Sequence, residues 1–289
     1  MKKVVRMLGL CALVALAFTS CKKEENKTVT FTATINQPTT NVRTHAMGLN
    51  NDYFLVWDNG DEIMVIDNTD GANENFKLTS FTNETATFKV VGDKVAFFDN
   101  FANKDYTAFY PLATINADDE VEIVLNETQT YRALHSFWKN TYPMCGHETV
   151  ITNAEGEPEL NFDFTSDCGF LYFTFQAPEG ETREFDHLTL TANDPTDYLN
   201  GTLVYDQEGN FQRLIPGTNV IEMNCEAKVI VTGDLLRDVT IILPAGALQS
   251  GFTVELFNNG ECVFSKAAQP IANTIVPMQY TEMMSMVIE

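Results

Sequence analysis

The stretch that decides the fold is Val29-Thr30-Phe31-Thr32-Ala33-Thr34-Ile35, in which apolar residues alternate strictly with threonine. A period of two places the apolar side chains on one face and the threonines on the other, which is the pattern of a half-buried β-strand. Threonine and β-branched residues also favour the extended, pleated backbone. We therefore predict that the ordered part of the chain begins with a strand.

Similar strand-like segments recur along the chain, separated by Gly, Asn and Asp turn signals at spacings of roughly 8 to 12 residues. One such signal, Asn59-Gly60 before an apolar run from Ile63, is typical of a tight hairpin because both residues tolerate positive φ. Only Asp234-Leu235-Leu236-Arg237 suggests a helical turn. The pattern predicts an all-β chain of two tandem antiparallel β-sandwich domains.

A polar segment with Gly and Pro, Asn153 to Pro158, is the expected boundary between the two domains. The expected organisation is a signal peptide at 1–20, a charged tether at 21–28, an N-terminal domain at 29–155 and a C-terminal domain at 156–289.

The first twenty residues have the features of an export signal. A basic start with Lys2, Lys3 and Arg6 precedes an apolar run from Leu8 to Phe18, which is too short for a bilayer core that needs roughly 20 residues. The small residues before Cys21 resemble the lipobox of bacterial lipoproteins, so Cys21 is the expected lipidation site. A plain secretory signal and a stop-transfer helix are the alternatives. The charged residues after Cys21 resemble a surface-export signal, and an inner-leaflet location is the other reading.

The charge balance narrows the range of partners. The chain has 18 basic and 40 acidic residues, a formal net charge of −22. Such a charge argues against nucleic acid, whose phosphates require clustered Lys and Arg, and against electrostatic docking on anionic lipids. Four cysteines remain beyond the anchor, and an exported chain could pair them in two disulfides or keep them as buried thiols: Cys145, Cys168, Cys225 and Cys262.

No catalytic pattern is found. The four histidines stand far apart in sequence and none lies beside a nucleophile motif. Asp67-Asn68-Thr69-Asp70-Gly71 is reminiscent of a calcium loop, but aligning Gly71 with the sixth loop position puts Ile66 and Lys77 where carboxylates are needed. A looser surface calcium site stays open. We expect no enzyme, no cofactor and no defined metal site.

The ordered landmarks of the chain resemble the fimbrillin family, the lipoprotein subunits of type V pili. The segments that carry the resemblance are Thr30–Ile35, Val42-Arg43-Thr44, Trp57–Ile63, Tyr106–Pro111, Gly201-Thr-Leu, Ile241–Pro244, Gly251–Leu256 and Ala272–Val276. The resemblance implies two transthyretin-like β-sandwich domains, an outer-membrane lipid anchor and a place in a fimbrium.

The resemblance also implies a way of assembling. An Arg-specific protease would cut at Arg43 and remove the first strand, and a donor strand from another subunit would replace it. The donor expected here is the C-terminal segment with Val276, Met278 and Tyr280, unless that segment is only the last strand of the second domain. Expected partners are other fimbrial subunits and a host glycan or protein receptor. A non-polymerising glycan-binding lipoprotein is the alternative function, with one candidate aromatic cluster: Tyr131, Phe137, Trp138 and Tyr142.

Overall fold

The computed structural model describes residues 28–37, 39–40, 57–82, 84–99, 101–131, 142–152, 158–235, 237–268, 275–283 and 285–289. Their regular structure is β-strand, with two 3-10 helices, η1 (Gly92–Phe98) and η2 (Phe101–Asn103). The all-β prediction is confirmed, while the transthyretin-like type stays a prediction. The helical turn expected at Asp234–Arg237 is wrong: Asp234 lies in a bend and a strand begins at Arg237.

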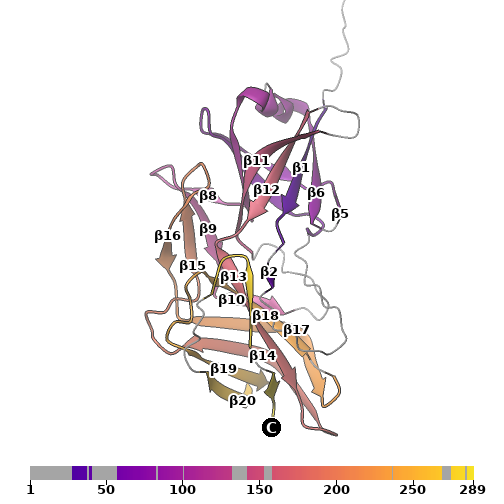
Figure 1. The fold of residues 1–289 in the computed structure, drawn as a ribbon, viewed down its shortest axis with the longest axis vertical. Coiled ribbons are helices and arrows are strands. Elements are labelled where there is room, and N and C mark those ends of the chain that lie inside the picture. The colour runs from indigo at the N-terminus through magenta and orange to yellow at the C-terminus, as the bar shows by residue number, and fades with distance from the viewer. Residues whose placement is uncertain are drawn as a thin grey trace, which may run out of the picture.

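The upper part of the molecule in Figure 1 is an eight-stranded sheet in the order β4-β3-β7-β11-β12-β1-β6-β5. In that order its strands are Ala72–Lys77, Glu62–Asp67, Tyr106–Tyr110, Met144–Thr152, Pro158–Thr165, Thr28–Ile35, Thr85–Val91 and Ser80–Thr82. Neighbours run antiparallel with one exception, because β1 and β12 are parallel. The first strand among the described residues, β1, therefore lies inside the sheet, between strands that come from elsewhere in the sequence.

Two sheets make up the lower part. One has the order β10-β17-β14-β19-β20 and the other β18-β13-β21-β2, with β22 also pairing with β13. Their strands are Thr128–Tyr131, Val220–Thr232, Thr182–Ala192, Phe252–Asn258 and Glu261–Ala268, then Arg237–Pro244, Cys168–Gln176, Gln279–Glu282, Thr39–Thr40 and Met286–Val287. Phe173 and Phe175 of β13 meet Phe252, Phe185 and Phe264 of the other sheet. The two sheets form a sandwich.

A smaller sheet stands at the side of the molecule, in the order β16-β15-β9-β8 (Figure 1). Its strands are Phe211–Pro216, Gly201–Tyr205, Val121–Leu125 and Thr114–Ile115. The turn between β15 and β16 packs on the upper sheet, since a Cβ on Gly209 would lie 2.4 Å from the sulfur of Cys145 on β11. The φ of Gly209 is +85°, so both the turn and the close approach favour glycine here.

The sheets do not follow the boundary expected at 155/156. β12 lies beyond that point in sequence, yet it pairs with β11 and β1 of the upper sheet. Conversely β9 and β10 precede it and pair with β15 and β17. Residues 153–157, where the boundary is expected, lie outside the described residues. A division into two domains remains a proposal, with the change of sheet falling between β12 and β13.

One buried glutamine joins the two sheets of the sandwich. Gln129 on β10 is 1% exposed. Its amide nitrogen donates to the carbonyl of Ile242 at 2.7 Å, and its amide oxygen accepts from the N–H of Ile242 at 3.0 Å. The side chain thus satisfies both backbone groups of one residue on β18, as a neighbouring strand would. This pair of hydrogen bonds closes the sandwich where the edge strands β10 and β18 meet.

Candidate functional site

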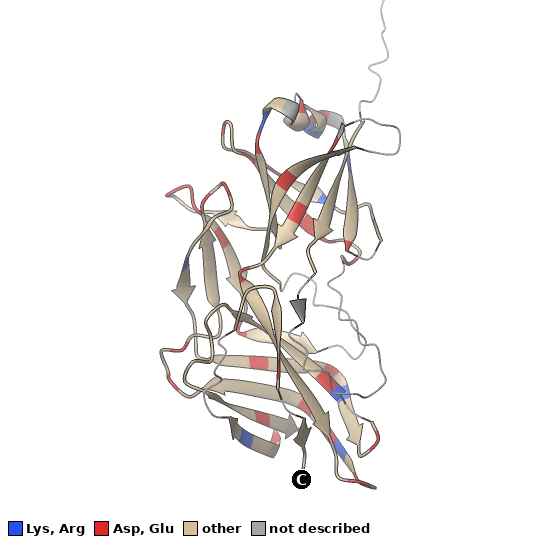
Figure 2. Ribbon diagram, viewed as in Figure 1, with Lys and Arg blue, Asp and Glu red and all other residues tan. Residues whose placement is uncertain are grey.

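The site that the fold singles out is the groove between β6 and β12 that β1 fills. β1 pairs with β6 from Thr28 to Thr34 and with β12 from Thr32 to Ile35. It carries no charged residue, so it is tan in Figure 2. Phe31, Ala33 and Ile35 are buried, as the alternating pattern predicts. A strand of this kind fills both a hydrogen-bonding gap and a row of apolar pockets.

Trp57 fixes the backbone of β1 from one side. Its indole Nε1 donates to the carbonyl of Ala33 at 3.2 Å and to that of Glu84 at 2.9 Å. The indole is buried and makes edge contacts with Phe88, Tyr110 and Phe164. Such an indole is held by both its apolar ring and its single polar group.

Asn161 holds the opposite face of β1. Its Oδ1 accepts hydrogen bonds from the hydroxyls of Thr32 at 2.9 Å and Thr34 at 3.2 Å. Its Nδ2 donates to Asp163 at 2.8 Å and to Thr149 at 3.2 Å. Sequence reasoning missed both Asn161 and the role of Trp57, although a polar residue between Leu160 and Phe162 was the available signal.

The residues expected to anchor the chain and to be cut after β1 are only partly among the described residues. Cys21 and Arg43 lie outside the described residues. On the near side of Arg43, β2 pairs in parallel with β21 through Thr39 and Thr40. The segment from β1 to β2 therefore runs from the upper sheet to the lower one, beside the chain that passes from β12 to β13.

The expected donor segment is part of the lower sandwich in this structure. Tyr280 is buried on β21, where its ring stacks on Phe170 at 4.6 Å. Met278 has a φ of +54° and receives a hydrogen bond on its sulfur from the hydroxyl of Tyr142 at 3.1 Å. Val276 is 36% exposed. In the isolated chain this segment leads into β21, a strand of its own sandwich, and its donor role stays a prediction.

The four candidate disulfide cysteines are free thiols in this structure. Cys225 and Cys262 lie on β17 and β20, with β14 and β19 between them. Three strand spacings amount to about 14 Å, whereas a disulfide needs Cα atoms within about 7 Å. Burial raises the pKa of the Cys168 thiol to about 12 and also raises that of Cys145. Cys145 and Cys168 are buried, and the pairing of the cysteines stays a prediction.

The aromatic cluster behind the glycan-binding alternative loses two of its four members. Tyr131 and Tyr142 are buried in the core. Phe137 and Trp138 lie outside the described residues. A sugar platform needs exposed rings, so Tyr131 and Tyr142 do not supply one.

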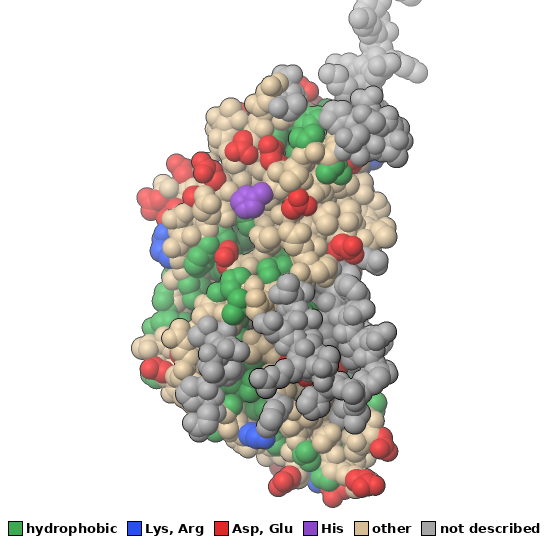
Figure 3. Space-filling view, viewed as in Figure 1, with side chains coloured by type: hydrophobic (Ala, Val, Ile, Leu, Met, Phe, Trp, Pro, Cys, Tyr) green, Lys and Arg blue, Asp and Glu red, His purple; other side chains and the backbone are tan. Residues whose placement is uncertain are grey.

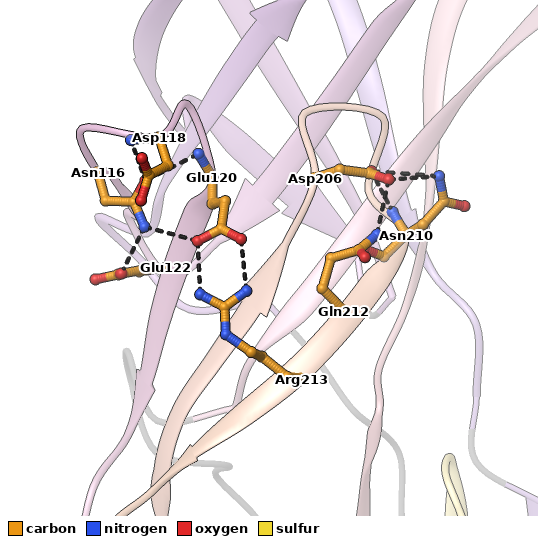
Figure 4. Close-up of polar contacts among 8 residues, drawn as sticks. All are labelled: Asn116, Asp118, Glu120, Glu122, Asp206, Asn210, Gln212 and Arg213. Atoms are coloured by element: carbon orange, nitrogen blue, oxygen red, sulfur yellow. Dashed lines mark hydrogen bonds and ion pairs between the residues drawn. The ribbon is translucent and has the colours of Figure 1, made fainter.

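An acidic turn on the side sheet forms a clamp (Figure 4). Arg213 on β16 donates to both oxygens of Glu120 at 2.5 and 2.7 Å, and Asn116 donates to Glu120 and Glu122. These hydrogen bonds, from Arg213 first and Asn116 second, lower the pKa of Glu120 to about 2. The carboxylate is thus occupied by protein donors. Among the described residues no group of three His, Cys, Asp or Glu side chains could hold a metal ion.

In the calcium-like loop, the carboxylate of Asp67 is also bonded to other groups of the protein. Asp67 is buried and pairs with Lys104, and it accepts the N–H of Thr69 at 3.0 Å. Although burial opposes it, the hydrogen bond from Lys104 holds the pKa of Asp67 below its usual value. The loop is a turn stabilised by an ion pair.

Two further observations concern the surface. Val124 and Ile215 flank Thr202 in register on the side sheet and are exposed, and Figure 3 shows hydrophobic side chains gathered over this part of the molecule.

None of the helices among the described residues is long and apolar enough to cross a membrane.

The chain was compared with known families, curated proteins and solved structures. No family model matches the chain, and no curated protein matches it. A candidate cell adhesion protein of Bacteroides ovatus is 15% identical, with a TM-score of 0.49 over 87% of this chain and 89% of that one.

Two of the others are fimbrial by description. A fimbrial protein of Bacteroides ovatus is 12% identical, with a TM-score of 0.44 over 91% of this chain and 49% of that one. The tip fimbrial protein Mfa3 of Porphyromonas gingivalis is 12% identical, with a TM-score of 0.36 over 86% and 83%. Because every TM-score is below 0.5, no functional residue is transferred from these structures to this chain.

Proposed function

We propose that this chain is a surface-exposed structural or adhesive subunit of a fimbrium, exported as a lipoprotein anchored at Cys21. Its assembly step is the replacement of β1 by a strand from another subunit after a cut at Arg43. The observation that carries this proposal is the position of β1 inside the eight-stranded sheet, parallel to β12.

The topology supports the separate removal of β1. Its two neighbours, β6 and β12, are paired on their other sides with β5 and β11. Each therefore keeps one partner when β1 leaves, and the gap exposes two rows of unpaired N–H and C=O groups. Unpaired edges of this kind bind a further strand readily. The vacated groove is thus an acceptor for one strand.

The energetics make an empty groove unfavourable. Fully burying a large apolar side chain is worth about 1.5–3 kcal/mol, and β1 buries two of them, Phe31 and Ile35. Their loss exposes the pockets beneath as well, so the vacated state costs several kcal/mol. An incoming strand that fills the same pockets recovers this free energy, which drives assembly without a further energy source.

The proposal is tested by limited digestion of the purified mature protein with an Arg-specific protease. We expect a ladder of oligomers on a denaturant-free gel, and Arg43→Ala should abolish it. Arg183→Ala is the matched control, since Arg183 lies on β14 beside its partner Glu181, far from β1 in sequence, and its ladder should persist. A digest in which the cut at Arg43 is complete but the protein stays monomeric contradicts the assembly step.

A further inference from the structure

The lower sandwich has a long open edge at β20, the last strand of the sheet β10-β17-β14-β19-β20. β20 runs from Glu261 to Ala268 and pairs with β19 on one side. Its other side has no strand partner among the described residues, and unpaired N–H and C=O groups of such an edge are a template for a further strand. Figure 1 shows β20 at the lower end of the molecule and β1 in its upper part. The edge is therefore separate from the groove that β1 fills.

The other sheet edges in the described part of the chain are short or blunted. β2 and β8 have two residues each, and β5 has three. On β4, the ammonium group of Lys94 donates to the backbone carbonyl of Asn75 at 2.8 Å. β16 ends at Pro216, which has no N–H, and the edges β10 and β18 are joined by Gln129. Shortness, a covering lysine and an edge proline are ways in which proteins prevent strand addition.

β20 lacks these protections. It has eight residues, none of them proline, and its two charged residues, Glu261 and Lys266, have opposite signs. Six of the eight residues are exposed, and Phe264 is half-buried. The ion pairs of the described residues do not include Lys266. In a chain with a formal net charge of −22, this strand is an electrically balanced edge that a second acidic chain can approach with little local repulsion.

The sequence of β20 is complementary to itself in the antiparallel direction. Two copies that pair in this way are related by a two-fold axis that passes through one residue of the strand. With the axis at Ser265, Phe264 lies opposite Lys266 of the second copy, and Val263 lies opposite Ala267. The axis repeats the first contact, so two ammonium groups each face an aromatic ring. An axis at Lys266 would instead place two like charges directly opposite each other, which is unfavourable.

We propose that β20 is an interface between two copies of this chain, which pair edge to edge with the two-fold axis at Ser265. The two five-stranded sheets then form one continuous sheet across the contact. Backbone hydrogen bonds supply the attraction, and the contacts between Phe264 and Lys266 set the register. One edge strand from each copy makes a small contact, so the dimer depends on concentration.

The first test is analytical ultracentrifugation of the full mature chain carrying Cys21→Ser, from about 1 μM to about 1 mM. No protease is added, so β1 stays in place. We expect a dimer that Lys266→Glu weakens at least about tenfold and that Lys266→Arg retains, because a guanidinium also stacks on aromatic rings. Lys89→Glu on β6 is the matched control, since it makes the same change of charge at an exposed residue of another sheet. It should leave the dimer unchanged.

The second test is disulfide trapping in a chain that carries Cys21→Ser and Cys262→Ser. Ser265→Cys should give a covalent dimer when a mild oxidant is added, because directly opposite residues have Cβ atoms about 4.5–5.5 Å apart. Ser80→Cys, an exposed residue of the edge strand β5, is the matched control and should stay monomeric. In the chain with its native Cys262, this thiol should not link to its copy, because six residues of strand, about 20 Å, separate the two in this register.

Four outcomes overturn the proposal. A chain that stays monomeric at about 1 mM has no such interface. A dimer that Lys266→Glu and Lys89→Glu weaken equally forms through general charge effects rather than through β20. Trapping through Cys262 rather than through Ser265→Cys shows that the register is wrong. A ladder of higher oligomers in place of a dimer shows that the contact is not a closed two-fold pair.

Discussion

Replacing Gln129 with leucine should be among the most destabilising single changes outside the aromatic core. Leucine fills a similar volume but leaves the N–H and the carbonyl of Ile242 without their partner. A buried polar group left unsatisfied costs about 1–3 kcal/mol. Two such groups cost about 2–6 kcal/mol, and the added apolar burial of leucine offsets about 1–2 kcal/mol of this. We therefore expect the free energy of unfolding to fall by about 1–4 kcal/mol.

The measurement is urea unfolding of the mature protein at pH 7, followed by tryptophan fluorescence and far-UV circular dichroism. Gln212→Leu is the matched control, since Gln212 is an exposed glutamine that donates to Asp206, and its effect should stay within about 0.5 kcal/mol. A loss below about 1 kcal/mol for Gln129→Leu refutes the claim that this side chain joins the two sheets.

Three more predictions concern β1, Glu148 and the cysteines. Phe31→Ala should lower the free energy of unfolding by about 3–5 kcal/mol, while Thr30→Ala on the exposed face of β1 should change it little; equal losses in urea titrations would contradict the role of the aromatic rings that surround Phe31. Burial first, and then the charge of Asp105, raises the pKa of Glu148 to about 7 in the folded protein. Its contribution to stability is therefore fully present below about pH 4.5 and is lost as the pH rises toward 7. Glu148→Gln should stabilise the protein at pH 8 more than at pH 5 in thermal unfolding scans, and a pH-independent effect would refute the assignment. Finally, Cys262 should react with a maleimide in the folded protein, whereas Cys145 should react only after unfolding. The labelled sites are identified by mass spectrometry. Rapid labelling of Cys145 in the folded protein would show that this side chain is not buried.

Local patterns were sufficient for the strands whose faces differ in polarity. The alternation in residues 29–35 predicted both β1 and the side chains that it buries. Gly92 and Asp93 are turn formers by residue type, yet Gly92–Phe98 forms the 3-10 helix η1. That apolar run packs its aromatic rings against Phe31 and Tyr106, so tertiary contacts outweigh local propensity there.

The pairing order of the strands could not be predicted from local sequence patterns. Nothing in the residues from Asn153 to Pro158 distinguishes a hairpin connection from a linker, because both need polar residues and turn formers. The pairing of β10 with β17 and of β1 with β12 joins segments more than 80 residues apart. Such pairings depend on which edges remain open once the local hairpins have formed. For the same reason, neither Asn161 nor Gln129 was recognised as a contact between distant strands.

The position of β1 has a mechanical consequence. Its backbone is hydrogen-bonded to β6 from Thr28 to Thr34 and to β12 from Thr32 to Ile35. A pull on the residues before Thr28 therefore loads both ladders in shear, so that many hydrogen bonds must break together rather than one after another as in unzipping. Tension applied at that end would be resisted most strongly by the strand that we propose to be exchanged. The proposed cut at Arg43 leaves both hydrogen-bonded ladders of β1 in place. A force along the strand axis would therefore release β1 more slowly than a force perpendicular to it.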